Sequence, residues 1–274
     1  MKNTKRILAL IAAGLLVLLY ISTLVFAMMD SEWAYSMFQI SIFSTVAVPV
    51  LLYAMILVYK RLKVKNQELF SDSINTVIFD VGNVLVNYDW KSYVKSFDFP
   101  EELNQLAASA MFENPLWEEA DRGVMTPQQL EDGFAANAPQ YADEMRMLFR
   151  RAEGTVTVYP YAREWVRELK NRGMKVYILS NYASQMFERT KKQMDFLPLV
   201  DGAIFSFQCH KIKPEQEIYQ KLIKKYQINP AKAVFIDDRS VNVEGAREAG
   251  LKALQFTSYK DTKSALERML QPGL

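Results

Sequence analysis

The chain has 274 residues, enough for one or two domains, and its 50% hydrophobic and 23% charged residues exclude a disordered or collagen-like protein. The formal net charge of +2 is too balanced for a protein whose main partner is nucleic acid, so we expect no nucleic-acid partner. The single cysteine, Cys209, excludes an internal disulfide, and the single histidine, His210, excludes a histidine-rich metal site.

Two long apolar stretches occupy the first sixty residues. Residues 7–29 and 38–59 carry no charged side chain, and each exceeds the about 20 residues that a helix needs to cross a bilayer. The connection from Asp30 to Met37 is short and aromatic, which is typical of a turn at a membrane interface. Basic residues flank both outer sides, so the positive-inside rule predicts cytoplasmic N- and C-termini. We therefore expect a multi-pass membrane protein, with a transmembrane hairpin and basic linker over residues 1–65 and a cytosolic domain after it.

The two alternatives to the hairpin are a cleaved signal peptide and a pair of buried core helices. Val25 and Ala27 have the small side chains of a signal-peptide cleavage site, but the apolar stretch exceeds the usual signal core of about 7–15 residues. After cleavage, the second stretch would still anchor the chain with the same orientation. Two buried core helices are disfavoured, because core helices seldom lack charge for so long.

From Ser71 onward, short apolar segments alternate with amphipathic helices. A helix is expected from Ala162 and ends at Gly173, a second begins at Pro214, and a third covers Val241 to Ala249. This alternation predicts an α/β fold with a doubly wound parallel sheet. The expected strands are Thr76–Phe79, Lys175–Leu179, Ala203–Phe205, Ala233–Ile236 and Lys252–Phe256.

The interval 88–159 between the first two of these strands is too long for a loop. It shows helical patterns and no strand pattern, so we expect a small helical cap over the sheet edge. Its aromatic residues Trp90, Trp117 and Tyr141 could line a substrate pocket or simply form core. The expected cap helices are Trp90–Phe97, Pro100–Phe112, Asn114–Arg122, Pro127–Asn137 and Ala142–Arg151.

Polar side chains stand where the predicted strands end. Open α/β sheets bind ligands outside the carboxyl ends of their strands, so these side chains should gather at one edge. Carboxylates suit Mg²⁺, while hydroxyl, amide and ammonium groups suit phosphate oxygens. An aspartate beside a bound phosphate can act as nucleophile and form an aspartyl-phosphate. The residues are Asp80 after the first strand, Ser180 and Asn181 after the second, Lys213 before the helix at Pro214, and Asp237, Asp238 and Asn242 after the fourth.

These segments resemble the four motifs of the haloacid dehalogenase superfamily, in order and spacing, over about residues 74 to 272. The motifs are Asp80 in IFDVGNVLV, Ser180 in VYILSN, Lys213 in KIKPEQEIY, and Asp237–Asp238 in VFIDDRSVNVEGA. The resemblance implies a haloacid dehalogenase-like domain over 66–274, with a Rossmann-like core (66–87 and 160–274) and a cap (88–159). It further implies Mg²⁺ and hydrolysis of a small phosphorylated substrate, as in the capped phosphatase branch.

The resemblance also assigns roles. Asp80 would be the nucleophile, and Asp80, the Gly82 carbonyl and Asp238 would hold Mg²⁺. Ser180, Asn181 and Lys213 would bind the phosphate, with Asp237 and Asn242 behind them. For the aspartate pair the alternative is N-capping of the next helix. Asn242 could orient Asp238 or Lys213, or merely occupy the first helical turn. Cys209 and His210 have no orienting partner in the sequence and are expected to lie outside the chemistry.

Gly82 departs from the family pattern. The family's first motif usually has a second aspartate there, whose side chain protonates the leaving group and whose carbonyl binds the metal. Glycine keeps the carbonyl but loses the acid, which is worth about 10²–10⁴-fold in rate. A working phosphatase acting on a sugar phosphate-like monoester, with another acid such as Asp89, remains the favoured reading. The alternative is a catalytically attenuated binding or regulatory protein at the membrane. A phosphomutase and a dehalogenase are disfavoured, and the sequence indicates no particular protein partner.

Overall fold

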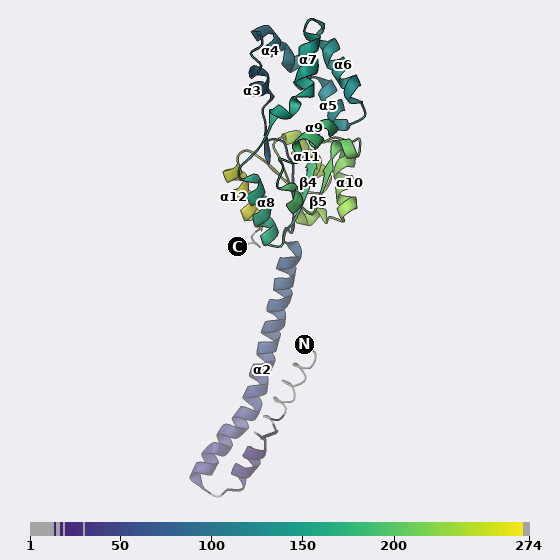
Figure 1. Cartoon of the computed structure of the whole chain (residues 1–274). Helices are drawn as coiled ribbons and strands as arrows, with labels where there is room; N and C mark the ends of the chain where they lie inside the picture. The colour runs from purple at the N-terminus through teal and green to yellow at the C-terminus, as the bar shows by residue number, and fades with distance from the viewer. Residues whose placement is uncertain (1–13, 15–16, 19, 30, 271–274) are drawn as a thin grey trace. The chain divides into compact units, whose positions relative to one another are not determined.

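The computed structural model describes residues 14, 17–18, 20–29 and 31–270 (Figure 1). The chain forms two compact units, Met1–Ser71 and Asp72–Leu274.

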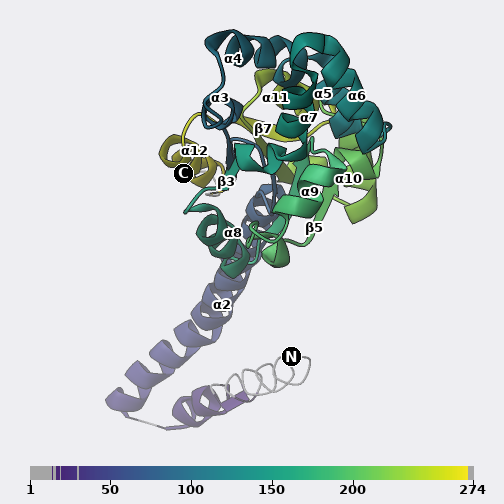
Figure 2. The same ribbon diagram turned by 45° about the horizontal axis from the view of Figure 1, so that its top comes forward.

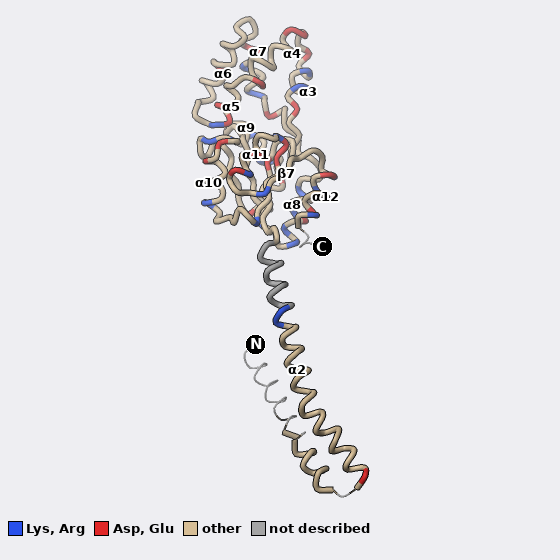
Figure 3. The backbone as a smooth tube through the Cα atoms, turned by 180° about the vertical axis from the view of Figure 1, so that it is seen from behind, with Lys and Arg blue, Asp and Glu red and all other residues tan. Residues whose placement is uncertain are grey.

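The N-terminal unit contains helix α2, Glu32–Asp72, with Pro49 inside it. In the described part of the chain, Glu32–Arg61 is the one helical stretch long and apolar enough to span a membrane. Its charged residues lie at its two ends (Figure 3). Residues 20–27 are also helical, but much of the first predicted span lies outside the described residues.

One expectation for this unit is corrected, and the expected linker, whose conformation was not predicted, is helical. The helix already begins at Glu32, so the turn is shorter than the predicted Asp30–Met37 connection. The expected linker up to residue 65 is part of the same helix, because nothing between 60 and 70 breaks a helix: the stretch lacks glycine and proline.

The C-terminal unit is built on a five-stranded parallel sheet in the order β5-β4-β1-β6-β7. The predicted α/β fold with a parallel sheet is confirmed, and every predicted strand is found within one residue of its expected ends. The three central strands have nearly every side chain buried, which explains their continuous apolar sequences. The strands are β1 Thr76–Phe79, β4 Lys175–Ser180, β5 Gly202–Phe205, β6 Ala233–Asp237 and β7 Lys252–Gln255.

Helices cover both faces of the sheet (Figure 1). Val77 and Phe79 of β1 share one apolar cluster with α8 and α12, while Ile78 shares a second cluster with α10 and α11. Lys213 and Pro214 precede α10 as a loop, so the predicted start of this helix at Pro214 is two residues early. The helices are α8 Ala162–Asn171, α9 Ser184–Thr190, α10 Gln216–Tyr226, α11 Ser240–Glu248 and α12 Tyr259–Leu270.

The interval between β1 and β4 forms a helical layer, α3 to α7, at one end of the sheet (Figures 1 and 2). A short antiparallel ribbon of β2, Val86–Tyr88, and β3, Val156–Val158, connects this cap to the core. The expectation of no strand here is wrong, because three-residue strands are too short to show a period of two. The cap helices are α3 Trp90–Lys95, α4 Glu101–Ala107, a π-helical turn Ala108–Phe112, α5 Pro115–Arg122, α6 Pro127–Asn137 and α7 Ala142–Arg150.

Candidate active site

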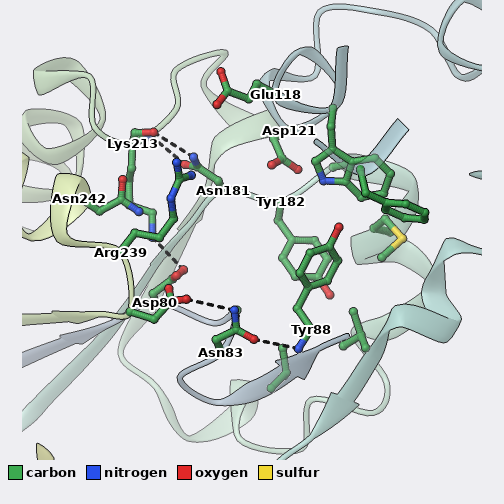
Figure 4. Close-up of a pocket in the computed structure, with 18 of the residues that line it drawn as sticks. Asp80, Asn83, Tyr88, Glu118, Asp121, Asn181, Tyr182, Lys213, Arg239 and Asn242 are labelled. Atoms are coloured by element: carbon green, nitrogen blue, oxygen red, sulfur yellow. Dashed lines mark hydrogen bonds and ion pairs between the residues drawn. The ribbon is translucent and has the colours of Figure 1, made fainter. Parts of the chain in front are cut away.

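A cavity of about 490 Å³ lies between the carboxyl edge of the sheet and the cap (Figure 4). Core residues supply carboxylate, amide and cationic groups to it, and the cap supplies aromatic and acidic groups. This mixture of apolar walls and a few polar groups is typical of a small-molecule site. The core side includes Asp80, Gly82, Asn83, Asn181, Lys213, Asp238, Arg239 and Asn242, and the cap side includes Phe112, Glu113, Asn114, Trp117, Glu118 and Asp121.

The strand register brings the motif residues together. Phe79 at the end of β1 pairs with Ile178 of β4 and with Ile236 of β6. The backbone N–H of Asp80 donates to the Ile236 carbonyl at 2.9 Å, so Asp80 leaves the sheet beside Asp237. Because all three strands run in parallel, their following residues meet at one edge.

Lys213 lies at the centre of this edge with 2% of its surface exposed. Its Nζ is 2.8 Å from Oδ1 of Asp80 and 2.5 Å from Oδ2 of Asp237. Burial lowers the pKa of Lys213, but the two carboxylates outweigh burial and raise it above the ordinary value. The ammonium is therefore charged and fixes the Asp80 carboxylate in one orientation.

The Asp80 carboxyl group responds to the same environment. Burial raises the pKa of Asp80 to about 7, while Lys213 acts in the opposite direction. One carboxylate oxygen, Oδ1, accepts from the Val81 N–H at 2.7 Å and also contacts Lys213. The other oxygen has no protein hydrogen bond among the described residues and is free to react or to bind a cation.

Asn181 has a function that its sequence position did not indicate. Its side-chain oxygen accepts from the Lys213 N–H at 2.7 Å, and its amide donates to the Lys213 carbonyl at 3.0 Å. The side chain therefore positions the lysine loop, while the residue still lines the cavity. Ser180 is 1% exposed, and among the described residues it is not part of the cavity wall.

Asn242 lies in the first turn of α11, as one alternative expected, and it orients Asp237. Its amide donates to both oxygens of Asp237, at 3.0 and 3.1 Å, and not to Asp238 or Lys213. The Arg239 N–H donates to Asp237 as well, at 2.9 Å. Asp237 is thus surrounded by protein donors and holds Lys213 in place.

Carboxylate oxygens of Asp80, Asp237 and Asp238 all lie within 4.8 Å of one another, so this cluster could hold a metal ion. Asp237 has both oxygens occupied by protein donors, whereas Asp80 and Asp238 each keep one oxygen without a protein partner in the described chain. Burial raises the pKa of Asp238, and the hydrogen bond from Asn83 opposes that shift. These hard oxygen donors fit Mg²⁺.

Asn83 is a site residue that the sequence pattern did not single out. It has a φ of 55°, a left-handed conformation that asparagine tolerates better than most residues. Its amide donates to Asp238 at 3.0 Å, and its oxygen accepts from the Tyr88 N–H at 3.1 Å (Figure 4). Asn83 thereby links the carboxylate cluster to the ribbon that carries the cap.

The cap contributes an acidic residue that was also missed. Asp121, in the last turn of α5, points into the cavity (Figure 4). Burial and the nearby Asp80 carboxylate raise the pKa of Asp121 to about 7. Trp117 lies four residues earlier, and such spacing places two side chains on one helix face. The four-residue spacing from Trp117, a candidate pocket residue, was therefore the signal in the sequence that could have indicated Asp121.

The other cap candidates lie elsewhere. Asp89 caps α3 by accepting from the Ser92 N–H at 3.0 Å and borders a different hollow. Its hydrogen bonds with Ser92 lower the pKa of Asp89. Among the described residues Asp89 is not part of the active-site cavity wall, so the structure does not place this suggested acid beside the leaving group. Trp90 stacks on Phe112, and the Tyr141 hydroxyl contacts Glu102. Of the three aromatic candidates in the described cap, Trp117 alone lines the cavity.

Cys209 and His210 lie outside the cavity wall of the described chain. The Cys209 thiol contacts the Lys211 carbonyl at 3.7 Å. His210 Nδ1 is 3.1 Å from the Arg122 carbonyl at the end of α5. The histidine therefore connects the core to the cap.

Two proteins are similar in sequence to this chain. Sesquiterpene phosphatase astK of Aspergillus oryzae is 25% identical over 198 residues, covering 72% of this chain and 97% of that protein. Pyrophosphatase PpaX of Bacillus cereus is 27% identical over 184 residues, covering 65% of this chain and 81% of that protein.

The fold is shared with solved structures. One of them is a HAD family enzyme of Bacteroides thetaiotaomicron in complex with magnesium and inorganic phosphate. It superposes with a TM-score of 0.55 at 19% identity, covering 70% of this chain and 98% of that one. The family model for haloacid dehalogenase-like hydrolases matches residues 74–250. With that match and the strand-end aspartates in view, the chain belongs to the haloacid dehalogenase-like hydrolases.

Proposed function

We propose that the chain is a membrane-anchored, Mg²⁺-dependent phosphatase that hydrolyses a small phosphate monoester through an aspartyl-phosphate on Asp80. The observation that carries this proposal is the buried Lys213 ammonium fixed between Asp80 and Asp237 at the base of the cavity. A carboxylate held this way has its free oxygen available to attack phosphorus. The phosphatase relatives and the phosphate-bound structural neighbour agree with this chemistry.

Asp80, the Gly82 carbonyl and Asp238 would hold Mg²⁺. When bound, Mg²⁺ would neutralise charge on the phosphoryl oxygens. The free oxygens of Asp80 and Asp238 support this ligand set, and the hydrogen-bonded Asp237 supports a role behind it for Asp237 and Asn242. Lys213 would bind the phosphate, with Asn181 beside it in the cavity wall, whereas Ser180 lies behind that wall and is not proposed to touch the phosphate. Lys213 also limits repulsion between the attacking carboxylate and the phosphate.

The substrate we propose is of sugar phosphate size. A cavity of about 490 Å³ accepts a small ester, and its lining contains both aromatic and hydrogen-bonding side chains. Trp117 and Tyr88 could pack on the apolar face of a sugar ring, while Asn114 and Glu113 could accept from its hydroxyls. The cap thus selects the substrate and restricts water.

Membrane anchoring rests on α2. Large apolar side chains such as Phe43 and Tyr53 are 74% and 65% exposed, and lipid is the solvent that favours such a surface. The basic residues at the end of the apolar stretch, Lys60 and Arg61, support a cytosolic catalytic domain. A reporter fused after Leu274 should be accessible in the cytosol, and an extracytoplasmic signal would reverse the orientation.

The activity is tested by phosphate release from sugar, nucleotide and acyl phosphates, with the full-length chain in detergent and Mg²⁺. Asp80→Asn should lower kcat by at least about 10³-fold, as loss of a nucleophile does elsewhere. Asp143→Asn is the matched control, because that side chain is 97% exposed on α7. Equal activity in Asp80→Asn would refute the nucleophile.

The second candidate is a catalytically attenuated binding or regulatory protein on the same fold. Gly82 favours it, because the acid expected there is absent. A wild-type chain that binds inorganic phosphate with Mg²⁺ but releases none from any of these esters would establish this alternative.

A further inference from the structure

Gly82, two residues after the proposed nucleophile, leaves unfilled space in the cavity. Gly82 lines the cavity, and a Cβ built on it meets nothing within 4 Å. The side chain that the family pattern has at this position would therefore have room, but glycine supplies no proton donor. An alkoxide leaving group needs a proton, so another group of the cavity must carry it.

Asp121 is placed to do this. Its carboxyl group points into the cavity from α5, on the cap side opposite the strand ends (Figure 4). In the described chain no hydrogen bond or ion pair reaches that carboxyl group. A partly buried acid without a protein partner is available to a ligand. The other carboxyl groups of the wall are either in the cluster around Lys213 or exposed, as Glu113 and Glu118 are.

The end of α5 is fastened to the core. The buried Ser206 hydroxyl donates to the Asp121 carbonyl at 2.5 Å, and Arg122 forms an ion pair with Glu215 at 2.7 Å. His210 contacts the Arg122 carbonyl. These three contacts come from the loop and helix after β5, so Asp121 belongs to the cap but is held at a fixed place relative to the sheet edge.

The surroundings favour the protonated form of this carboxyl group. Burial raises the pKa of Asp121 to about 7, with a further contribution from the Asp80 carboxylate. A phosphoryl group bound at Asp80 adds negative charge nearby and favours the protonated form further. The charged and titratable groups that face Asp121 are Asp80, Glu118, Lys213, Arg239, Tyr88 and Tyr182.

We propose that Asp121 is the general acid of this enzyme and replaces from the cap the function missing at Gly82. This inference rests on the phosphatase function proposed above. As Asp80 forms its O–P bond, the ester O–P bond breaks and the Asp121 proton passes to the leaving oxygen. In the second step the Asp121 carboxylate takes a proton from water as the water oxygen bonds to phosphorus and the Asp80 O–P bond breaks. The sum is ester plus water to alcohol plus phosphate.

The experiment compares Asp121→Asn with wild type on an alkyl phosphate and on p-nitrophenyl phosphate, whose leaving group needs little protonation. We expect kcat/KM for the alkyl ester to fall by about 10²-fold or more, and for the aryl ester by less than about 10-fold. The alkaline fall of the wild-type alkyl profile should disappear in the variant. Asp89→Asn is the matched control, since asparagine also caps helices, and it should change neither rate by more than about 3-fold.

Gly82→Asp provides the rescue, because its side chain has room. In the Asp121→Asn background it should restore alkyl phosphate turnover, and alone it should add less than about 3-fold, since an acid is already present. The Tm of Asp121→Asn should not fall below that of wild type, and its affinity for inorganic phosphate should be unchanged, which separates lost chemistry from lost folding. Asp121→Ser is the second variant if the first fails to fold.

Two outcomes overturn the inference while leaving the phosphatase function intact. One is an equal fall on both esters, which would indicate a structural role for Asp121. The other is a gain of about 10²-fold from Gly82→Asp alone, which would show that the wild type has no acid. A wild type inert on both esters fails differently, since it refutes the phosphatase function and the acid together.

Discussion

Mg²⁺ should stabilise the C-terminal unit, and Asp238→Asn should remove most of that effect. The three carboxylates of the cluster have oxygens within 4.8 Å of one another, and Lys213 contacts two of them. One ammonium among three carboxylates leaves a net charge of about −2 when all are ionised. A divalent cation therefore relieves the repulsion between these carboxylates when it binds.

The spacing of the carboxylates sets the repulsion that a cation relieves, and the Mg²⁺ concentration relative to Kd sets the expected rise in Tm. Two unit charges 4.8 Å apart repel by about 3 kcal/mol at an effective dielectric constant of about 20. Mg²⁺ at about 100 times its Kd stabilises the folded state by about 2.7 kcal/mol. For a domain of this length each kcal/mol raises Tm by about 2–4 °C, so the expected rise is about 5–10 °C.

The assay is thermal unfolding of the full-length chain in detergent, followed by tryptophan fluorescence with EDTA or with Mg²⁺. Buried Trp165 reports on the core of the C-terminal unit. In EDTA, Asp238→Asn should be at least as stable as wild type, because it removes one repelling charge. Adding Mg²⁺ should raise the Tm of this variant by less than about 2 °C. Asp143→Asn is the control and should show the same rise in Tm with Mg²⁺ as wild type. A rise of that size in Asp238→Asn would refute the assignment of Asp238 as a ligand.

Three further outcomes are expected. Lys213→Met leaves two buried aspartates without their cation, so urea denaturation should show a loss of about 3–5 kcal/mol. Folding raises the pKa of Asp121 from 3.8 to about 7, so the folded state binds more protons in that range and loses stability as pH rises through it. In EDTA, the Tm of Asp121→Asn relative to wild type should therefore be higher at pH 8 than at pH 5, and an equal difference would contradict the burial argument. Gly123, with a φ of 71°, approaches Phe207 so closely that an added Cβ would lie 2.7 Å from the Phe207 Cβ. Gly123→Ala should displace the end of α5 and lower alkyl phosphate turnover, whereas Gly173→Ala, also at positive φ but in open space, should lower stability alone.

The core of the site was predictable because it depends on strands. A parallel strand buried on both faces has an apolar run that reads directly from the sequence, and its end fixes where the next residue lies. Asp80 and Asp237 were found this way. Hydrogen-bond partners were not, since Asn181 holds Lys213 and Asn242 holds Asp237 across 32 and 5 residues. Such pairings depend on the loop conformation, which no periodic pattern encodes.

The acid of the cap was not predicted for a different reason: its one signal in the sequence was the spacing from Trp117, a residue that could equally form core. Helix α5 contains Glu118, Glu119 and Asp121, and its sequence does not say which face meets the sheet edge. That choice is made by residues more than 80 positions later, Ser206 and His210, which contact the backbone at the end of the helix. Asp89 was suggested because it lies near Gly82 in the sequence, but it caps α3 and borders a different hollow.

Division of the site between core and cap has a consequence for specificity. The strand ends hold Asp80 and Lys213, whereas the proposed acid, Asp121, is held in place by the contacts that the end of α5 makes with the core. A substrate that keeps α5 away would therefore still meet the nucleophile but would lack the proton. Esters of poor leaving groups should then be hydrolysed only if their alcohol part fits beneath the cap. Activated esters should be hydrolysed whether or not it fits, because their leaving groups need little protonation. The absence of an acid at position 82 would thus make the cap a specificity device for the chemical step as well as for binding.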